Sequence, residues 1–122
     1  FEPLAPVETD FINTAAEGIR FARQFNSAAM SIILDVKAMS SEGKPVPQII
    51  RESAGSFAYF HANDVNLKGP GFGDVDFVPI FAALRDARYG GVVSVEVFKF
   101  DEGADVIARQ SLDNMKRAAG LA

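Results

Sequence analysis

Four side chains in this sequence could together bind a metal ion. Glu2, Asp35, His61 and Glu96 each stand at or near the end of a short apolar segment. Three carboxylates and one imidazole form a donor set for a divalent cation, and its oxygen-rich character favours Mn²⁺, Mg²⁺ or Co²⁺, although Zn²⁺ is also compatible. Without a cation, mutual repulsion and desolvation would make three neighbouring carboxylates unfavourable in free energy. The pattern predicts a shared metal site.

Each of these residues also has a simpler interpretation. A lone histidine at a strand end is often a hydrogen-bonded structural residue, Asp35 could cap a helix or form a loop, and Glu2 could be solvated. Glu96 lies between two valines, where an unpaired carboxylate is costly. The metal site is favoured because all four residues occupy equivalent positions.

The apolar segments that lead to these residues have the composition of buried strands. Strands are predicted for residues 30–34, 57–60 and 92–98, and the start FEPLAP reads as the end of a further strand. Pro3 and Pro6 limit how far that first strand can extend.

Helical spacing separates the predicted strands. Thr9 or Asp10 is the predicted cap of a first helix. Asp76 is the predicted cap of another helix, and Gly90 and Gly91 are predicted to end it. Residues 48–54 and 104–119 are predicted helices, residues 36–47 a loop, and Gly120 a stop. The predicted buried faces consist of Phe11, Ala15, Ile19, Ala22 and Phe25 in the first helix and Ala108, Leu112, Met115 and Ala119 in the last.

This alternation predicts an α/β fold with parallel strands and helices packed outside them. The strands are too apolar to suggest a solvated face. In parallel α/β folds the strand-to-helix loops open at the carboxyl ends of the strands, so functional groups gather at that edge. No linker divides residues 1–122, which are predicted to form a single domain.

The loop GPGFGDVDF admits two interpretations. Its glycines could surround a phosphate group, with Lys68 neutralising the charge. The spacing matches neither a P-loop nor a dinucleotide fingerprint. A tight turn that leads into the Asp76 cap is therefore the favoured interpretation.

The overall composition excludes several classes of function. The 122 residues include no cysteine, which rules out disulfides and thiolate chemistry, and the net charge of −4 argues against a nucleic-acid partner. No apolar run is long enough for a membrane span. The absence of cysteine is compatible with the cytoplasm, which is the predicted location. Because the chain begins with Phe1 rather than Met, we expect a fragment or processed product of a longer protein.

Five segments in this order resemble a known superfamily: FEPL…VETDF, ILDVKAM, FHANDVN, GPGFGDVDF and VSVEVF. They are similar to the C-terminal half of the sugar phosphate isomerase/epimerase superfamily, whose members are xylose isomerase-like TIM barrels. The resemblance implies a (β/α)8 barrel of which this chain supplies about the last four β/α units. A half barrel would need its missing N-terminal half or a second copy of itself.

The resemblance also implies roles for individual residues. The family's metal ligands fall on Glu2, Asp35, His61 and Glu96, and its acid–base pair falls on Glu2 and Glu96. Glu8 matches a glutamate that contacts the substrate.

Four positions depart from the epimerase pattern. Ala38 replaces a substrate-binding histidine, Leu67 replaces an arginine, and Ala5 and Pro6 replace an asparagine–arginine pair. We expect Asn66 and Lys68, which flank Leu67, to contact the substrate. The resemblance implies a conserved metal chemistry with altered sugar contacts.

The resulting prediction is a metal-dependent isomerase or epimerase that acts on a small sugar or polyol through an enediolate. An inosose dehydratase-like lyase and a non-catalytic half barrel are the alternatives. Related barrels that act as DNA-repair endonucleases use more zinc ligands and a basic surface, which the single histidine and acidic charge argue against.

Overall fold

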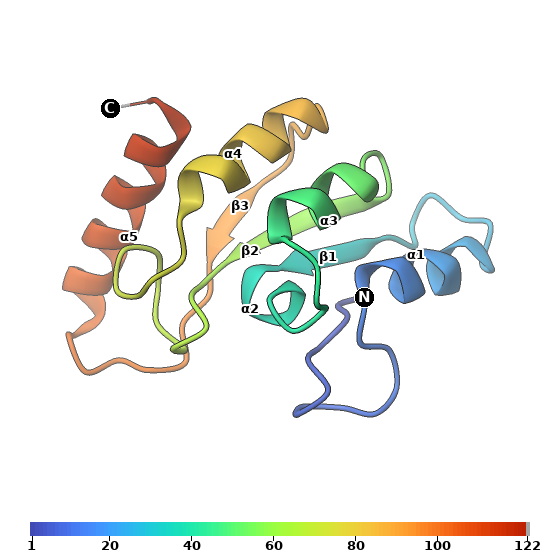
Figure 1. Cartoon of the computed structure of the whole chain (residues 1–122), viewed down its shortest axis with the longest axis horizontal. Coiled ribbons are helices and arrows are strands. Elements are labelled where there is room, and N and C mark those ends of the chain that lie inside the picture. Colours follow the sequence, from blue (N-terminus) through green and yellow to red (C-terminus); the bar gives the residue numbers. More distant parts are fainter. Residues whose placement is uncertain (122) are drawn as a thin grey trace.

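A computed structural model describes residues 1–121 and shows alternating strands and helices (Figure 1). Three parallel strands form one sheet in the order β1-β2-β3, which confirms the α/β class and a partial barrel. The elements are α1 Ala15–Arg23, β1 Ile32–Asp35, α2 Val36–Met39, α3 Val46–Glu52, β2 Phe57–Ala62, α4 Phe77–Asp86, β3 Val93–Val95 and α5 Ala104–Ala119.

The N-terminal segment runs beside β1, where the sequence predicts the end of a strand. The amino group of Phe1 donates to the Ser31 carbonyl at 3.1 Å, and the Ile33 N–H donates to the Phe1 carbonyl at 2.8 Å. This is the hydrogen-bond pattern of a parallel pair. The pairing stays that short because Pro3 has no N–H to donate.

The helices cover one face of the sheet and leave the other face open. Figure 1 shows α3, α4 and α5 in a row, with α4 in contact with both neighbours. Along β2, Phe60 and Ala62 are buried in the core, whereas Tyr59 and His61 alternate with them and Tyr59 is 36% exposed. The prediction that the strands have no solvated face is therefore wrong for the described residues.

Helix α1 begins at Ala15, four residues later than an Asp10 cap would place it. The cap is Thr14, whose hydroxyl accepts a hydrogen bond from the Glu17 N–H at 3.2 Å while the Glu17 carboxylate accepts from the Thr14 N–H at 3.1 Å. This capping box satisfies two N–H groups at once, which Thr9 and Asp10 cannot match. Phe11 consequently lies in the preceding loop and is 65% exposed.

The predicted loop after β1 contains a short helix, α2, because Asp35 accepts a hydrogen bond from the Ala38 N–H at 2.8 Å. Helix α4 ends at Asp86, before the two predicted glycines. Helix α5 has the predicted bounds and ends on Gly120 in the left-handed conformation.

The buried face of α5 includes Met115, as predicted, but otherwise differs from the prediction. Ile107, Ser111 and Met115 are buried, whereas Leu112 is 47% exposed. The glycine-rich loop explains the difference, because Gly69 lies directly against Ser111: a Cβ added to Gly69 would lie 2.3 Å from the Ser111 hydroxyl oxygen. A small polar residue therefore faces the loop.

The glycine-rich loop is a turn that leads into α4. The Asp76 side chain caps α4 by accepting a hydrogen bond from the Val78 N–H at 2.9 Å, as predicted. Gly73 permits a close approach to the buried Asp64, whose carboxylate accepts from the Val75 N–H at 2.9 Å. Within residues 1–121 no helix is both long and apolar enough to cross a bilayer.

The capping box predicts the effect of a single substitution on stability. Thr14→Ala removes the hydroxyl acceptor, so we expect the free energy of unfolding to fall by about 1 kcal/mol, as measured by urea titration. Asp10→Ala is the control, since Asp10 is exposed and lies outside α1, and its expected effect is below about 0.5 kcal/mol. Equal losses in the two variants would contradict Thr14 as the cap.

Candidate metal centre

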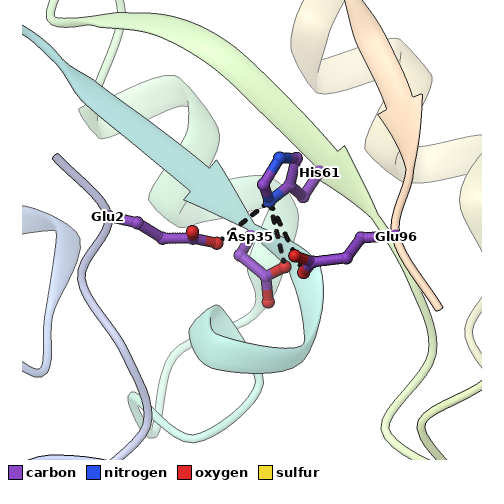
Figure 2. A group of neighbouring side chains, drawn as sticks. All are labelled: Glu2, Asp35, His61 and Glu96. Atoms are coloured by element: carbon purple, nitrogen blue, oxygen red, sulfur yellow. Dashed lines mark hydrogen bonds and ion pairs between the residues drawn. The ribbon is translucent and has the colours of Figure 1, made fainter. Parts of the chain in front are cut away.

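Glu2, Asp35, His61 and Glu96 come together at the carboxyl ends of the strands (Figure 2). One ligand atom from each residue lies within 4.8 Å of all the others. His61 Nδ1 lies 3.0 Å from Glu2 Oε1, 3.5 Å from Glu96 Oε2 and 3.8 Å from Asp35 Oδ2. The structure thus joins all four residues that the sequence singled out.

The register of the parallel strands produces this convergence. Asp35 pairs with His61 across β1 and β2, and His61 pairs with Ser94 across β2 and β3. The Glu96 N–H donates to the Ala62 carbonyl at 3.2 Å, which extends the β2–β3 pairing by one step beyond β3. Because paired residues stand side by side, successive strands deliver their polar ends to one point.

The two carboxylate oxygens of Asp35 have different neighbours. One carboxylate oxygen, Oδ1, caps α2 through the Ala38 N–H, and the other, Oδ2, faces His61 and Asn63. The side chain is almost fully buried. Helix capping therefore fixes the direction in which Asp35 presents its second oxygen to the cluster.

The cluster carries an unbalanced negative charge. Burial, the largest cause, raises the pKa of Glu96 above its ordinary value, and the charges of Glu2 and Asp35 raise it further, whereas His61 lowers it. A divalent cation would remove this repulsion, and the oxygen-rich donors suit such an ion. The residues present therefore fit a divalent metal.

Glu8 lies in a neighbouring group with Lys37. Lys37 Nζ lies 2.6 Å from Glu8 Oε1 and 4.3 Å from the centre of the Phe98 ring, and Glu8 Oε2 accepts from the Ala5 N–H at 3.2 Å. Sequence analysis missed Lys37, although its position two residues after Asp35 was a usable signal.

A hollow of about 460 Å³ adjoins this ion pair. Most of its lining is apolar, and Leu67 is part of it. The lining residues are Ala5, Val7, Glu8, Lys37, Val65, Leu67 and Phe98.

Asn66 and Lys68 make contacts within and between loops. The Asn66 amide donates to the Phe72 carbonyl at 2.9 Å and accepts from the Lys68 N–H at 2.9 Å. The Lys68 ammonium is paired with Glu102 and lies 3.8 Å from Asp101. The substrate contacts expected of these two residues remain a prediction.

Fold and site together define the class: a parallel α/β half barrel with an acidic cluster at the carboxyl ends of its strands. The family model described as xylose isomerase-like TIM barrel matches residues 1–118. The chain belongs to that family.

The relatives in this family include sugar epimerases. The chain is 34% identical over 97 residues to D-psicose 3-epimerase of Ruminiclostridium cellulolyticum, covering 80% of this chain and 33% of the relative. It is 34% identical over 91 residues to L-ribulose 3-epimerase of Mesorhizobium japonicum, covering 75% and 31%.

A solved structure of the same kind shows how far the fold extends. A crystal structure of D-psicose 3-epimerase in the presence of D-fructose superposes with a TM-score of 0.88 at 28% identity, covering 98% of this chain and 48% of that one. The chain thus spans about a third of the length of the curated relatives and about half of this structure.

The raised pKa of Glu96 predicts a pH dependence in the metal-free protein. The folded-state pKa exceeds the ordinary value of 4.5, so this group costs stability as pH rises from the unfolded value through the folded one. Glu96→Gln cannot ionise, so we expect its free energy of unfolding, relative to the natural chain, to improve over that pH window. Urea titrations in chelator at several pH values measure this difference, and a pH-independent difference would contradict the assignment.

Proposed function

We propose that this chain supplies half of the active site of a divalent-metal-dependent ketose epimerase or isomerase. The observation that carries the proposal is the convergence of one imidazole and three carboxylates within 4.8 Å at the carboxyl edge of the sheet. The sugar epimerases among the relatives support the same class of substrate, a small sugar or polyol. Mn²⁺, Mg²⁺ and Co²⁺ suit the donors best, and Zn²⁺ is compatible with them.

Glu2, Asp35, His61 and Glu96 are the proposed ligands. A bound divalent ion would supply charge stabilisation for the enediolate that forms when a proton leaves the carbon next to a carbonyl. The buried Asp35, fixed by its helix cap, acts only as a ligand. The resemblance to the epimerases assigns the movement of protons to Glu2 and Glu96.

Glu2 and Glu96 approach the cluster from opposite sides, as Figure 2 shows. This arrangement suits epimerisation, in which one carboxylate removes a proton from one face of a carbon and the other carboxylic acid returns a proton to the opposite face. Return of the proton to the neighbouring carbon instead gives isomerisation. The opposed carboxylates favour epimerisation.

The substrate would lie between this half barrel and a second half. The face of the sheet that carries Tyr59 and His61 is open in the described residues, and the solved relative is about twice as long as this chain. We propose that either an N-terminal half of the barrel or a second copy of the chain closes this face.

Glu96→Gln tests the proposed chemistry. The test uses the barrel closed by its second half. We expect the variant to keep its fold, as measured by circular dichroism. We also expect it to lose turnover of ketoses, as measured by chromatography of the epimer pair, because the amide cannot exchange the proton. Chelation should abolish turnover of the natural protein and Mn²⁺ should restore it. Turnover of the variant at the natural rate would refute the mechanism.

Leu67 provides a test of substrate preference. An apolar wall cannot hydrogen-bond a sugar hydroxyl, and it rejects one only weakly. Leu67→Arg restores the residue that epimerases carry, so we expect the ratio of kcat/KM for a hydroxylated ketose over its deoxy analogue to rise by about tenfold or more.

The control for this test is Lys99→Arg, a substitution outside the lining of the hollow. An unchanged ratio in Leu67→Arg would contradict a role for this wall in specificity.

A further inference from the structure

Asn63 lies beside the cluster and bonds two of its members, although its type suggests only a loop residue. It follows β2 directly and is completely buried, with 0% exposure. Its Nδ2 donates to Asp35 Oδ2 at 2.5 Å and to Glu96 Oε2 at 3.3 Å, and its Oδ1 accepts from the Lys37 N–H at 2.8 Å. One amide therefore connects residues at the ends of all three strands.

The Lys37 N–H fixes the orientation of this amide. A backbone N–H can only donate, so the atom that faces it must be the Asn63 oxygen. The amide nitrogen then points toward Asp35 and Glu96 and has two hydrogens, one for each carboxylate. An aspartate at this position would offer only acceptors and would add a further negative charge.

We infer that Asn63 is a positioning residue that holds Asp35 and Glu96 in the geometry in which they bind the metal. The inference rests on the proposed metal site. Hydrogen bonds to carboxylates are charge-assisted, so the Asn63 amide offsets part of the repulsion between Asp35 and Glu96. Because the amide is neutral, it does not compete with a metal cation for the two carboxylates. Residues that orient metal ligands in this way typically change metal affinity by about 10–100-fold when they are replaced.

This role differs from ordinary loop stabilisation in what it predicts. If Asn63 only stabilised the loop, its loss would lower the melting temperature and leave metal affinity in the folded protein unchanged. If Asn63 positions the ligands, its loss should lower both the melting temperature and the metal affinity. In either case the substitution leaves both partners of the Asp35–Ala38 cap in place, because that bond uses Oδ1 rather than Oδ2.

The experiment is a calorimetric titration of the 122-residue chain with Mn²⁺, together with melting in chelator. We expect Asn63→Ala to raise the Kd for Mn²⁺ by about tenfold or more. Asn66→Ala is the matched control, because its amide also makes two hydrogen bonds in the same loop but bonds to Phe72 and Lys68 rather than to the cluster. We expect its melting temperature to fall and its Kd to stay within about twofold of the natural value.

Asn63→Ser serves if the alanine variant fails to fold, since its hydroxyl can donate only one hydrogen bond. We expect a smaller increase in Kd in the same direction. If a folded Asn63 variant binds Mn²⁺ with the same Kd as the natural chain, the positioning role is wrong, whereas the metal site is still supported. Failure of the natural chain to bind Mn²⁺, Mg²⁺, Co²⁺ or Zn²⁺ would overturn the metal site and the role of Asn63 together.

Discussion

The convergence of three carboxylates on one imidazole is the constraint on which the rest of this structure depends. Such a group is unfavourable by itself, because burial and mutual repulsion both oppose ionisation of Glu96. Its geometry is nevertheless strictly maintained by parallel pairing, in which Asp35 and His61 stand side by side. A slip of one residue would turn the side chains of a strand to the opposite face. The register of the sheet is therefore also the geometry of the site.

Local hydrogen bonds supplement the register at each strand end. Asp35 is held by the first turn of α2, and the Asn63 amide spans from Asp35 to Glu96. The Glu2 position follows from the pairing of Phe1 with β1. Strand pairing and these local hydrogen bonds bring the four side chains together, so the chain already holds the proposed ligand atoms within 4.8 Å of one another. Preorganisation of this kind reduces the cost of assembling a site when an ion binds.

Sequence reasoning predicted the parts of the fold whose signals are local. The Asp76 cap and the bounds of α5 depend on neighbouring residues, and both are confirmed. The start of α1 was also readable, because Thr14 has a glutamate three residues later and Thr9 and Asp10 have none. The buried face of α5 was beyond reach, since it depends on a glycine more than 30 residues away in sequence. The contacts of Asn63 could not be predicted, because they depend on where side chains point once the register is set.

The loop after β2 contacts both the acidic cluster and the hollow, through different residues. Asn63 points inward to the ligands, whereas Leu67 lines the hollow and adopts a left-handed backbone, with φ of 73°. The Leu67 carbonyl accepts hydrogen bonds from the Phe98 and Lys99 N–H groups at 2.9 and 3.1 Å, so its backbone is held independently of its side chain. A substitution at position 67 can therefore change the wall of the hollow while the loop, and with it the ligand geometry, stays in place. This separation would allow the wall of the hollow to change without disturbing the proposed metal site.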